Sequence, residues 1–238
     1  MDFSGKNILV VGGSSGIGLS LVKLLVQHRA TVYNISRNPA IDWPVGINHL
    51  ALDVLEDVSS LPACLPEQLH GIVYSAGSIN LKPFNRFTDN DFLNDYKINV
   101  LGAVKVIQQS LKQLKNAKGA SVVLVSSVAA RTGMAFHASI AAAKGAVEGL
   151  ALSLAAELAP QQVRVNVVSP SLTDTPLAQN LLNTPEKREV SAKRHPLNKY
   201  GKPADIANMM AFLLADESAW ITGQVIGVDG GLGVLKVN

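Results

Sequence analysis

Residues 10–18 read VVGGSSGIG, and the segments on either side of them differ in character. Residues 7–11 (NILVV) form a short and nearly continuous apolar run, which is typical of a strand buried on both faces. Residues 19–30 (LSLVKLLVQHRA) carry apolar side chains at the spacing of an amphipathic helix. The beginning of the chain therefore predicts a strand, a glycine-rich turn and a helix.

The same alternation of short β-branched runs and longer helical patterns continues to the end of the chain. Strands that alternate with helices form right-handed βαβ units, whose helices cover both faces of a parallel sheet. We therefore expect one domain over residues 1–238, an α/β fold with a doubly wound, Rossmann-type parallel sheet of about seven strands. Further strands are predicted at residues 31–36, 48–54, 71–77, 120–127, 163–170 and 223–231, and further helices at about 89–116, 138–158 and 203–216.

The composition limits what kind of protein this chain can be. Hydrophobic residues make up 47% of the 238 residues, and the net charge of +3 is too small and too evenly spread for a nucleic-acid surface. The one cysteine, Cys64, cannot form an internal disulfide, and nothing indicates a metal site. We expect no leader segment, and the sequence contains no uncharged apolar run of about 18 residues. We expect a cytoplasmic protein that binds neither nucleic acid nor a membrane.

The glycines of the first turn, Gly12, Gly16 and Gly18, allow a tight turn and a close approach of the backbone to a phosphate group. The helix that follows offers free N–H groups and the positive end of its dipole to the same phosphate. Such a turn can also be an ordinary connection between a strand and a helix. Its position between a clear strand and a clear helix at the start of the domain favours a nucleotide site.

The spacing Gly-x-x-x-Gly-x-Gly resembles that of the short-chain dehydrogenase/reductase family, and the resemblance extends over essentially the whole chain. Residues 74–77 (YSAG) resemble an Asn-Asn-Ala-Gly stretch of the family, and residues 200–207 and 221–231 resemble its C-terminal signature. The resemblance implies an oxidoreductase with a nicotinamide cofactor. It also implies that Asn99, Ser127 and Lys144 are catalytic residues.

The same resemblance implies which residues surround the cofactor. Asp53 and Val54 are similar to the pair that closes on the adenine, and Pro170 and Thr175 are similar to residues that hold the nicotinamide amide. The full expected set comprises Gly12, Ser14, Ser15, Gly16, Ile17, Gly18, Ser36, Arg37, Asp53, Val54, Ser75, Ala76, Gly77, Asn99, Lys144, Pro170, Thr173 and Thr175.

Several positions depart from the family pattern. Val11 stands where the family usually has threonine, Ser75 replaces an asparagine, and Ser171 replaces a glycine. The segment between Arg37 and Asp53 is short, so we expect the helix at this place to be curtailed to a loop. These changes affect the detailed geometry of a cofactor site without abolishing it.

The end of the second predicted strand bears on the choice of cofactor. A carboxylate there would accept hydrogen bonds from the adenosine hydroxyls and repel a 2′-phosphate, but Ser36 occupies the position and Arg37 follows it. A guanidinium can pair bidentately with a phosphate, although many surface arginines are only solvated. We therefore expect NADP(H) to be preferred over NAD(H).

The family places a proton-donating tyrosine four residues before the catalytic lysine, but Ile140 stands at this position here. Isoleucine has no ionisable group, and losing a positioned general acid costs about 10²–10⁴ in rate. Three residues could replace the tyrosine: His137, Lys144 and Tyr200. His137 is one helical turn from Ile140, but it could equally be a structural histidine at a helix start or an interface. The alternative role of Lys144 is to bind the ribose without donating a proton. The alternative role of Tyr200 is ordinary packing in a loop.

Two functions therefore remain open. The chain is either an NADP(H)-dependent oxidoreductase with a non-standard proton donor, acting on a small carbonyl or alcohol substrate, or a catalytically weak NADP(H)-binding sensor or scaffold. Residues 177–202, between a strand and a helix, are a possible substrate lid. The predicted helices at 89–116 and 138–158 carry more apolar residues than one sheet face needs, which favours a homodimer or homotetramer.

Overall fold

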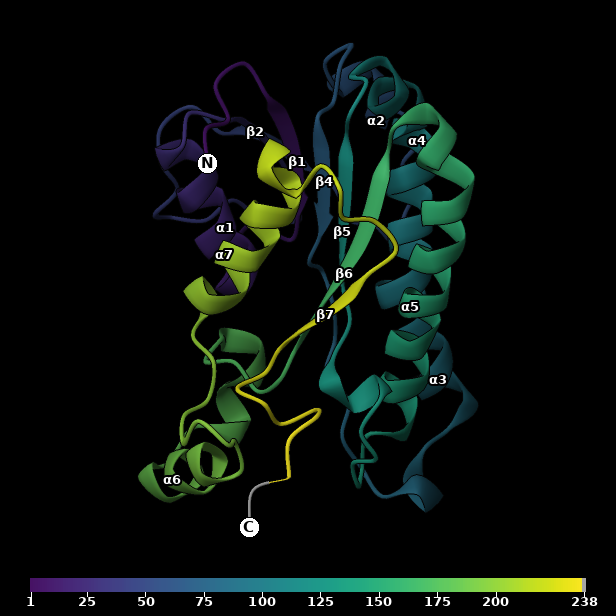
Figure 1. The fold of residues 1–238 in the computed structure, drawn as a ribbon. Coiled ribbons are helices and arrows are strands. Elements are labelled where there is room, and N and C mark those ends of the chain that lie inside the picture. The colour runs from purple at the N-terminus through teal and green to yellow at the C-terminus, as the bar shows by residue number, and fades with distance from the viewer. Residues whose placement is uncertain (237–238) are drawn as a thin grey trace.

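Seven parallel strands form the central sheet of the computed structural model, which describes residues 1–236 (Figure 1). Their spatial order is β3-β2-β1-β4-β5-β6-β7, so the chain starts in the middle of the sheet and winds outward in both directions. The predicted doubly wound α/β fold is therefore confirmed. The strands are β1 (Asn7–Val11), β2 (Thr31–Ser36), β3 (Asn48–Ala51), β4 (Gly71–Tyr74), β5 (Ser121–Val125), β6 (Arg164–Pro170) and β7 (Val225–Val228).

Helices cover both faces of this sheet, as Figure 1 shows. The helices α1 (Gly16–Gln27) and α7 (Pro203–Leu214) pack side by side on one face. The other face is covered by α2 (Leu61–Cys64), α3 (Asp89–Tyr96), α4 (Gly102–Asn116) and α5 (Ala138–Leu158). The short helix α6 (Pro185–Lys193) lies beyond the carboxyl ends of the strands.

The alternation of side chains along β1 explains why this strand is apolar throughout. Ile8 and Val10 pack on the side of α1 and α7, whereas Leu9 and Val11 pack on the side of α4 and α5. All four side chains are at most 1% exposed. Both faces of the sheet are thus part of the core, as a parallel sheet requires.

The predicted helix at 89–116 is interrupted by a π-helical turn, Lys97–Leu101, between α3 and α4. The hydroxyl of Tyr74 donates a hydrogen bond of 2.6 Å to the Ile98 carbonyl inside this turn. The phenol fits there because Gly102 has no Cβ, which would overlap the Tyr74 oxygen. The turn matters for the site, because it carries Asn99.

Other boundaries differ from the prediction by a few residues. The first helix begins at Gly16, inside the glycine-rich turn, and β3, β4 and β7 end earlier than expected. Residues 37–47 contain no helix, as predicted, and the Trp43 indole in this loop donates a hydrogen bond of 2.8 Å to the Gly13 carbonyl. The possible lid at 177–202 is partly helical, since it contains a 3₁₀ helix (Pro176–Leu181) and α6.

The stretch Ala138–Gln161 has the length and mean hydropathy (1.3) of a helix that could cross a membrane. In the fold this stretch lies along the sheet, and eight side chains of α5 are buried inside the domain. Its apolar character is therefore explained in part by its place in the core.

Candidate active site

Two adjoining cavities lie at the carboxyl ends of the strands, the edge at which doubly wound sheets bind ligands. The first, which we call the glycine-loop cavity, has a volume of about 430 Å³ and is lined by the turn after β1. The second, the serine–lysine cavity, has a volume of about 300 Å³ and is lined by Ser127 and Lys144. The two cavities share a wall made of Ile17, Ser75, Gly77, Thr175 and Leu177.

The glycine-loop cavity has the shape that a nucleotide phosphate needs. Gly12 has a φ of +85°, and a Cβ on it would lie 2.9 Å from the Ala76 nitrogen. A Cβ on Gly18 would overlap the Gly12 carbonyl, so only glycine permits this close crossing. Ser15 precedes α1 without forming a side-chain cap, which leaves the first N–H groups of the helix to a ligand. The cradle therefore fits the phosphates of a dinucleotide.

Most of the residues expected around a cofactor line these cavities. Pro170, Thr173 and Lys144 line the serine–lysine cavity, and Thr175 lines both. The members of the expected set that line the glycine-loop cavity are Gly12, Ser14, Ser15, Gly16, Ile17, Gly18, Ser36, Arg37, Asp53, Val54, Ser75, Ala76 and Gly77.

The end of β2 presents a cation to the glycine-loop cavity. Arg37 is exposed, lines the cavity and forms no ion pair within residues 1–236. Ser36 is buried, and its hydroxyl donates to the Asn38 carbonyl at 2.8 Å while it accepts from Asn34 Nδ2 at 2.9 Å. The Ser36 side chain thus holds the loop, and the guanidinium of Arg37 is the group that can meet a phosphate.

The Lys144 ammonium is fixed in the serine–lysine cavity by the end of β5. Its Nζ donates to the Val125 carbonyl at 2.8 Å, and the Lys144 carbonyl accepts from Ser126 Oγ at 3.3 Å. Burial lowers the pKa of Lys144 to about 8, and the negative charge of Asp95 opposes this shift. Ser127, next in the chain, lines the same cavity.

Asn99 lies behind Gly77 rather than in the wall of either cavity. Its side chain is buried, and Nδ2 donates to Ser78 Oγ at 3.0 Å and to the Asp95 carbonyl at 2.8 Å. Among residues 1–236, its Oδ1 has no hydrogen-bond partner. A Cβ on Gly77 would lie 3.0 Å from this oxygen and 3.5 Å from Lys144 Nζ, so both groups flank Gly77.

Asp95 is a buried carboxylate next to this group that the sequence analysis did not single out. It is 2% exposed and accepts hydrogen bonds from Ser78 Oγ at 2.6 Å and from Ser139 Oγ at 2.5 Å. Ser78 lines the serine–lysine cavity, and Ser139 directly precedes Ile140 on α5. One signal was available, since Asp95 precedes Asn99 by one helical turn.

The three residues considered as proton donors occupy different places. His137 and Lys144 line the serine–lysine cavity together with Ile140. The Nδ1 of His137 donates to the Ala135 carbonyl at 2.7 Å, which leaves Nε2 as the second ring nitrogen. Tyr200 lines neither cavity, and its hydroxyl accepts a hydrogen bond of 2.7 Å from Arg188. The structure thus brings two of the three into the candidate site.

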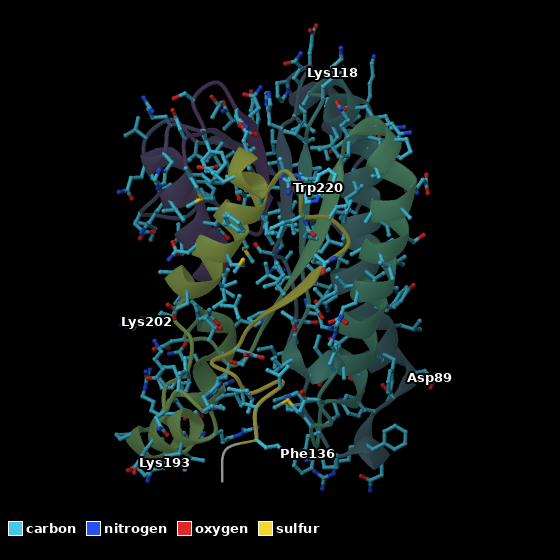
Figure 2. The ribbon with its side chains drawn as sticks, in the orientation of Figure 1. Asp89, Lys118, Phe136, Lys193, Lys202 and Trp220 are labelled. Atoms are coloured by element: carbon cyan, nitrogen blue, oxygen red, sulfur yellow. The ribbon has the colours of Figure 1, made fainter. Side chains whose placement is uncertain are left out.

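The lid segment contributes a second polar group that the sequence analysis missed. His195 is 3% exposed, lines the serine–lysine cavity and lies 2.8 Å from Ser171 Oγ through its Nε2. Figure 2 shows Phe136, just before the start of α5, and Lys193, at the end of α6, at the same end of the molecule. His137, directly after Phe136, and His195, two residues after Lys193, both line the serine–lysine cavity.

Comparisons with known proteins agree with this geometry. The family model described as "Enoyl-(Acyl carrier protein) reductase" matches residues 56–233. The chain is 33% identical to the 3-oxoacyl-[acyl-carrier-protein] reductase of Thermotoga maritima, over 98% of this chain and 99% of that protein. A short-chain type dehydrogenase/reductase from Mycobacterium ulcerans superposes with a TM-score of 0.90 at 30% identity, covering 98% of this chain and 92% of that one. ElxO, solved with NADP bound, gives a TM-score of 0.88 at 25% identity, over 95% and 98% of the two chains.

The match covers nearly the full length of both chains, and most residues that the sequence motifs single out line the glycine-loop or the serine–lysine cavity. The chain therefore belongs to the short-chain dehydrogenase/reductase family of oxidoreductases, which act on carbonyl and alcohol substrates.

Proposed function

We propose that this protein is an NADP(H)-dependent oxidoreductase that interconverts a small carbonyl compound and its alcohol with a proton donor other than tyrosine. One observation carries the proposal: the glycine-loop cavity adjoins a cavity that holds Ser127 and Lys144 but has Ile140 at the place of the expected acid. The proposed substrate is small, because about 300 Å³ is at the lower end of ligand pockets.

The cofactor would be held by residues of both cavities. The N–H groups at the start of α1 would bind the phosphates, Lys144 the ribose, and Pro170 and Thr175 the nicotinamide amide. When bound, the reduced nicotinamide supplies the hydride. The apolar side chains of Leu177, Leu181 and Leu232 line the serine–lysine cavity and would limit the access of water to a bound nicotinamide.

The preference for NADP(H) is supported by charge. Arg37 is a cation at the edge of the glycine-loop cavity, and no carboxylate stands at the end of β2 to repel a 2′-phosphate. The structural similarity to ElxO, which was solved with NADP bound, supports the same choice.

The chain's own residues would organise the substrate oxygen. The Ser127 hydroxyl would donate a hydrogen bond to it, and the Lys144 ammonium would stabilise the developing negative charge. Ile140 can donate nothing at this place. The groups that line the cavity and could supply the proton instead are His137, Lys144, and Ser171 together with His195.

A second function is favoured by the same isoleucine. A chain that keeps the cofactor cradle and lacks the acid could sense NADP(H) or support a partner without turnover. Two measurements separate the possibilities: titration of the protein with NADPH and NADH, and NADPH oxidation in the presence of a panel of ketones, diketones and aldehydes. NADPH binding with turnover supports the oxidoreductase, and tight binding without turnover supports the sensor.

We further propose a cytoplasmic homodimer or homotetramer. Leu152 on the outer face of α5 is 62% exposed, and Leu101 in the π-helical turn before α4 is 40% exposed, so α5 and this turn leave apolar surface that a second copy could cover. Light scattering at micromolar concentration tests this, and a monomer would contradict it. The exposed thiol of Cys64 is compatible with a reducing compartment.

A further inference from the structure

Ser171 and His195 form a hydrogen-bonded pair in the wall of the serine–lysine cavity. Ser171 directly follows β6, and His195 follows α6, so the pair joins the sheet to the lid segment. Ser171 Oγ and His195 Nε2 are 2.8 Å apart. The histidine is buried from bulk solvent, and both residues line the cavity. A serine held by a histidine in this way is a common arrangement for activating a hydroxyl.

The second ring nitrogen fixes where the hydrogens of this pair lie. His195 Nδ1 is 2.7 Å from the backbone carbonyl of Ser191, which can only accept, so Nδ1 carries a hydrogen. In the neutral ring, Nε2 then accepts from the Ser171 hydroxyl. In the imidazolium, Nε2 donates to Ser171 Oγ, whose own hydrogen becomes available to another acceptor. One such acceptor in the protein is the Asp229 carbonyl, 3.4 Å from Ser171 Oγ, which is long for a hydrogen bond. A substrate oxygen in the cavity is another.

Ser171 also lies close to Ser127, because β6, which Ser171 follows, is the neighbour of β5, which precedes Ser127. Strands β5 and β6 pair with Val125 opposite Val168, and neighbouring strands are about 4.8 Å apart. Ser127 comes two residues after this pair and Ser171 three residues after it. Both line the cavity that contains Lys144.

We propose that Ser171 is a catalytic residue that delivers the proton to the substrate oxygen, and that His195 supplies this proton through Ser171. The proposal rests on the proposed oxidoreductase function. In the reduction, the carbonyl carbon receives the hydride from the reduced nicotinamide, and the π electron pair of the C=O bond moves to the oxygen. That oxygen takes the proton of the Ser171 hydroxyl as the Ser171 O–H bond breaks. Ser171 Oγ takes the proton from Nε2 of the His195 imidazolium, which leaves the ring neutral. Alcohol oxidation runs the same steps in reverse.

Two departures from the family pattern then compensate each other. Ile140 lacks a hydroxyl where the resemblance predicts tyrosine, and Ser171 has a hydroxyl where it predicts glycine. Both residues line the serine–lysine cavity. The proton would thus come from the wall formed by β6 instead of the wall formed by α5.

The first test compares Ser171→Ala and His195→Gln with the wild type. Glutamine can accept a hydrogen bond from Ser171 but cannot pass on a proton, so both variants should lower kcat by about a hundredfold. The affinity for NADPH, measured by fluorescence titration, should change by less than about twofold in both. The control is Ser169→Ala, which removes a buried hydroxyl from β6, the strand that precedes Ser171. Ser169 lines neither cavity, so this variant should change kcat by less than about twofold.

A second experiment separates proton delivery from a structural role. In an Ile140→Tyr background the phenol can supply the proton, so adding Ser171→Ala should lower kcat by less than about threefold. A side chain that only shapes the cavity would cause the same loss in both backgrounds. Nitrogen NMR of labelled histidine provides a readout without turnover, since Ser171→Ala should shift the Nε2 resonance of His195 and leave that of Nδ1 in place.

Three results would overturn the proposal. The first is an unchanged kcat in Ser171→Ala, and the second is an equal loss in the wild-type and Ile140→Tyr backgrounds. The third is a loss of about a hundredfold in His137→Ala alone, which would make His137 the donor. A wild type that binds NADPH but reduces no carbonyl compound overturns the proposed function and this proposal together, whereas normal wild-type turnover with any of the three results overturns this proposal alone.

Discussion

Ile140 lies one helical turn before Lys144 on α5, and the two side chains line the same cavity. Residues four apart on a helix face the same side, so a longer polar side chain at 140 would lie beside the Lys144 ammonium. Ile140 itself is 5% exposed and apolar. The candidate site thus pairs a buried cation with a neighbour that cannot hold a proton.

The substitution Ile140→Tyr should restore a proton donor. Its phenol would lie near Lys144 and Ser127, where the lysine charge favours loss of the phenolic proton. We expect NADPH oxidation with simple ketones or diketones to rise about tenfold or more, with little change in cofactor affinity. Steady-state kinetics and NADPH titration measure the two effects.

The matched control for this variant is Ile140→Phe, which adds the ring without the hydroxyl. It should not raise the rate, because the gain depends on proton transfer and not on filling the cavity. If phenylalanine raises the rate as much as tyrosine, the missing hydroxyl is not what limits the wild type.

Arg37→Ala should remove most of the preference for NADP(H). A guanidinium that meets a 2′-phosphate forms charge-assisted hydrogen bonds, so we expect the wild type to bind NADPH about tenfold or more tightly than NADH. The variant should bind NADPH and NADH with similar affinity. Only NADPH loses a contact with the guanidinium, because NADH has no 2′-phosphate. Arg29→Ala is the control, since Arg29 pairs with Asp2 and lines neither cavity. Equal affinities in the wild type would refute the prediction.

The sequence predicted the parts of the site that are encoded locally. The glycines, Arg37 and Ser127 lie at the ends of strands or the start of a helix, and Lys144 lies inside α5, so each motif specified its own backbone conformation. The predicted doubly wound sheet followed from the same pattern of strands and helices.

The rest could not be predicted because it depends on contacts between distant segments. Ser171 and His195 are 24 residues apart, and the histidine lies in a segment that showed no clear periodicity. Asp95 reaches the site through Ser78 and Ser139, which come from two other elements. Only the packing of α3 against α5 and the end of β4 brings these polar groups together.

The charge of Lys144 should make carbonyl reduction depend on pH. Burial lowers the pKa of Lys144 to about 8, so activity that needs the ammonium should fall as the pH rises through this value. Asp95 raises this pKa, and Asp95→Asn removes its charge, so the decline should move to lower pH in the variant. Initial rates across the range on both sides of pH 8, at saturating NADPH, measure the midpoint.

The control for this prediction is Asp89→Asn, which removes the same charge from an exposed position in the first turn of α3. Figure 2 shows Asp89 at the outer edge of the molecule, and solvent there screens its charge. Its midpoint should match that of the wild type. His137 and His195 line the same cavity, so the profiles of His137→Ala and His195→Gln identify any part that does not belong to Lys144. An unmoved midpoint in Asp95→Asn would show that this carboxylate does not act on the lysine.

Gly18→Ala should abolish tight cofactor binding while the protein still folds. The added Cβ would overlap the Gly12 carbonyl and come within 2.7 Å of Ser75 Oγ, so the turn after β1 must open to accept it. Because the first N–H groups of α1 bind phosphate only when this turn is closed, NADPH affinity should fall by about a hundredfold or more. Gly133→Ala is the matched control, since a Cβ there meets no atom of the described residues 1–236 within 4 Å. Isothermal titration gives the affinities, and circular dichroism shows whether the variants keep their helices. If Gly18→Ala binds NADPH as the wild type does, the glycine-loop cavity is not the phosphate site.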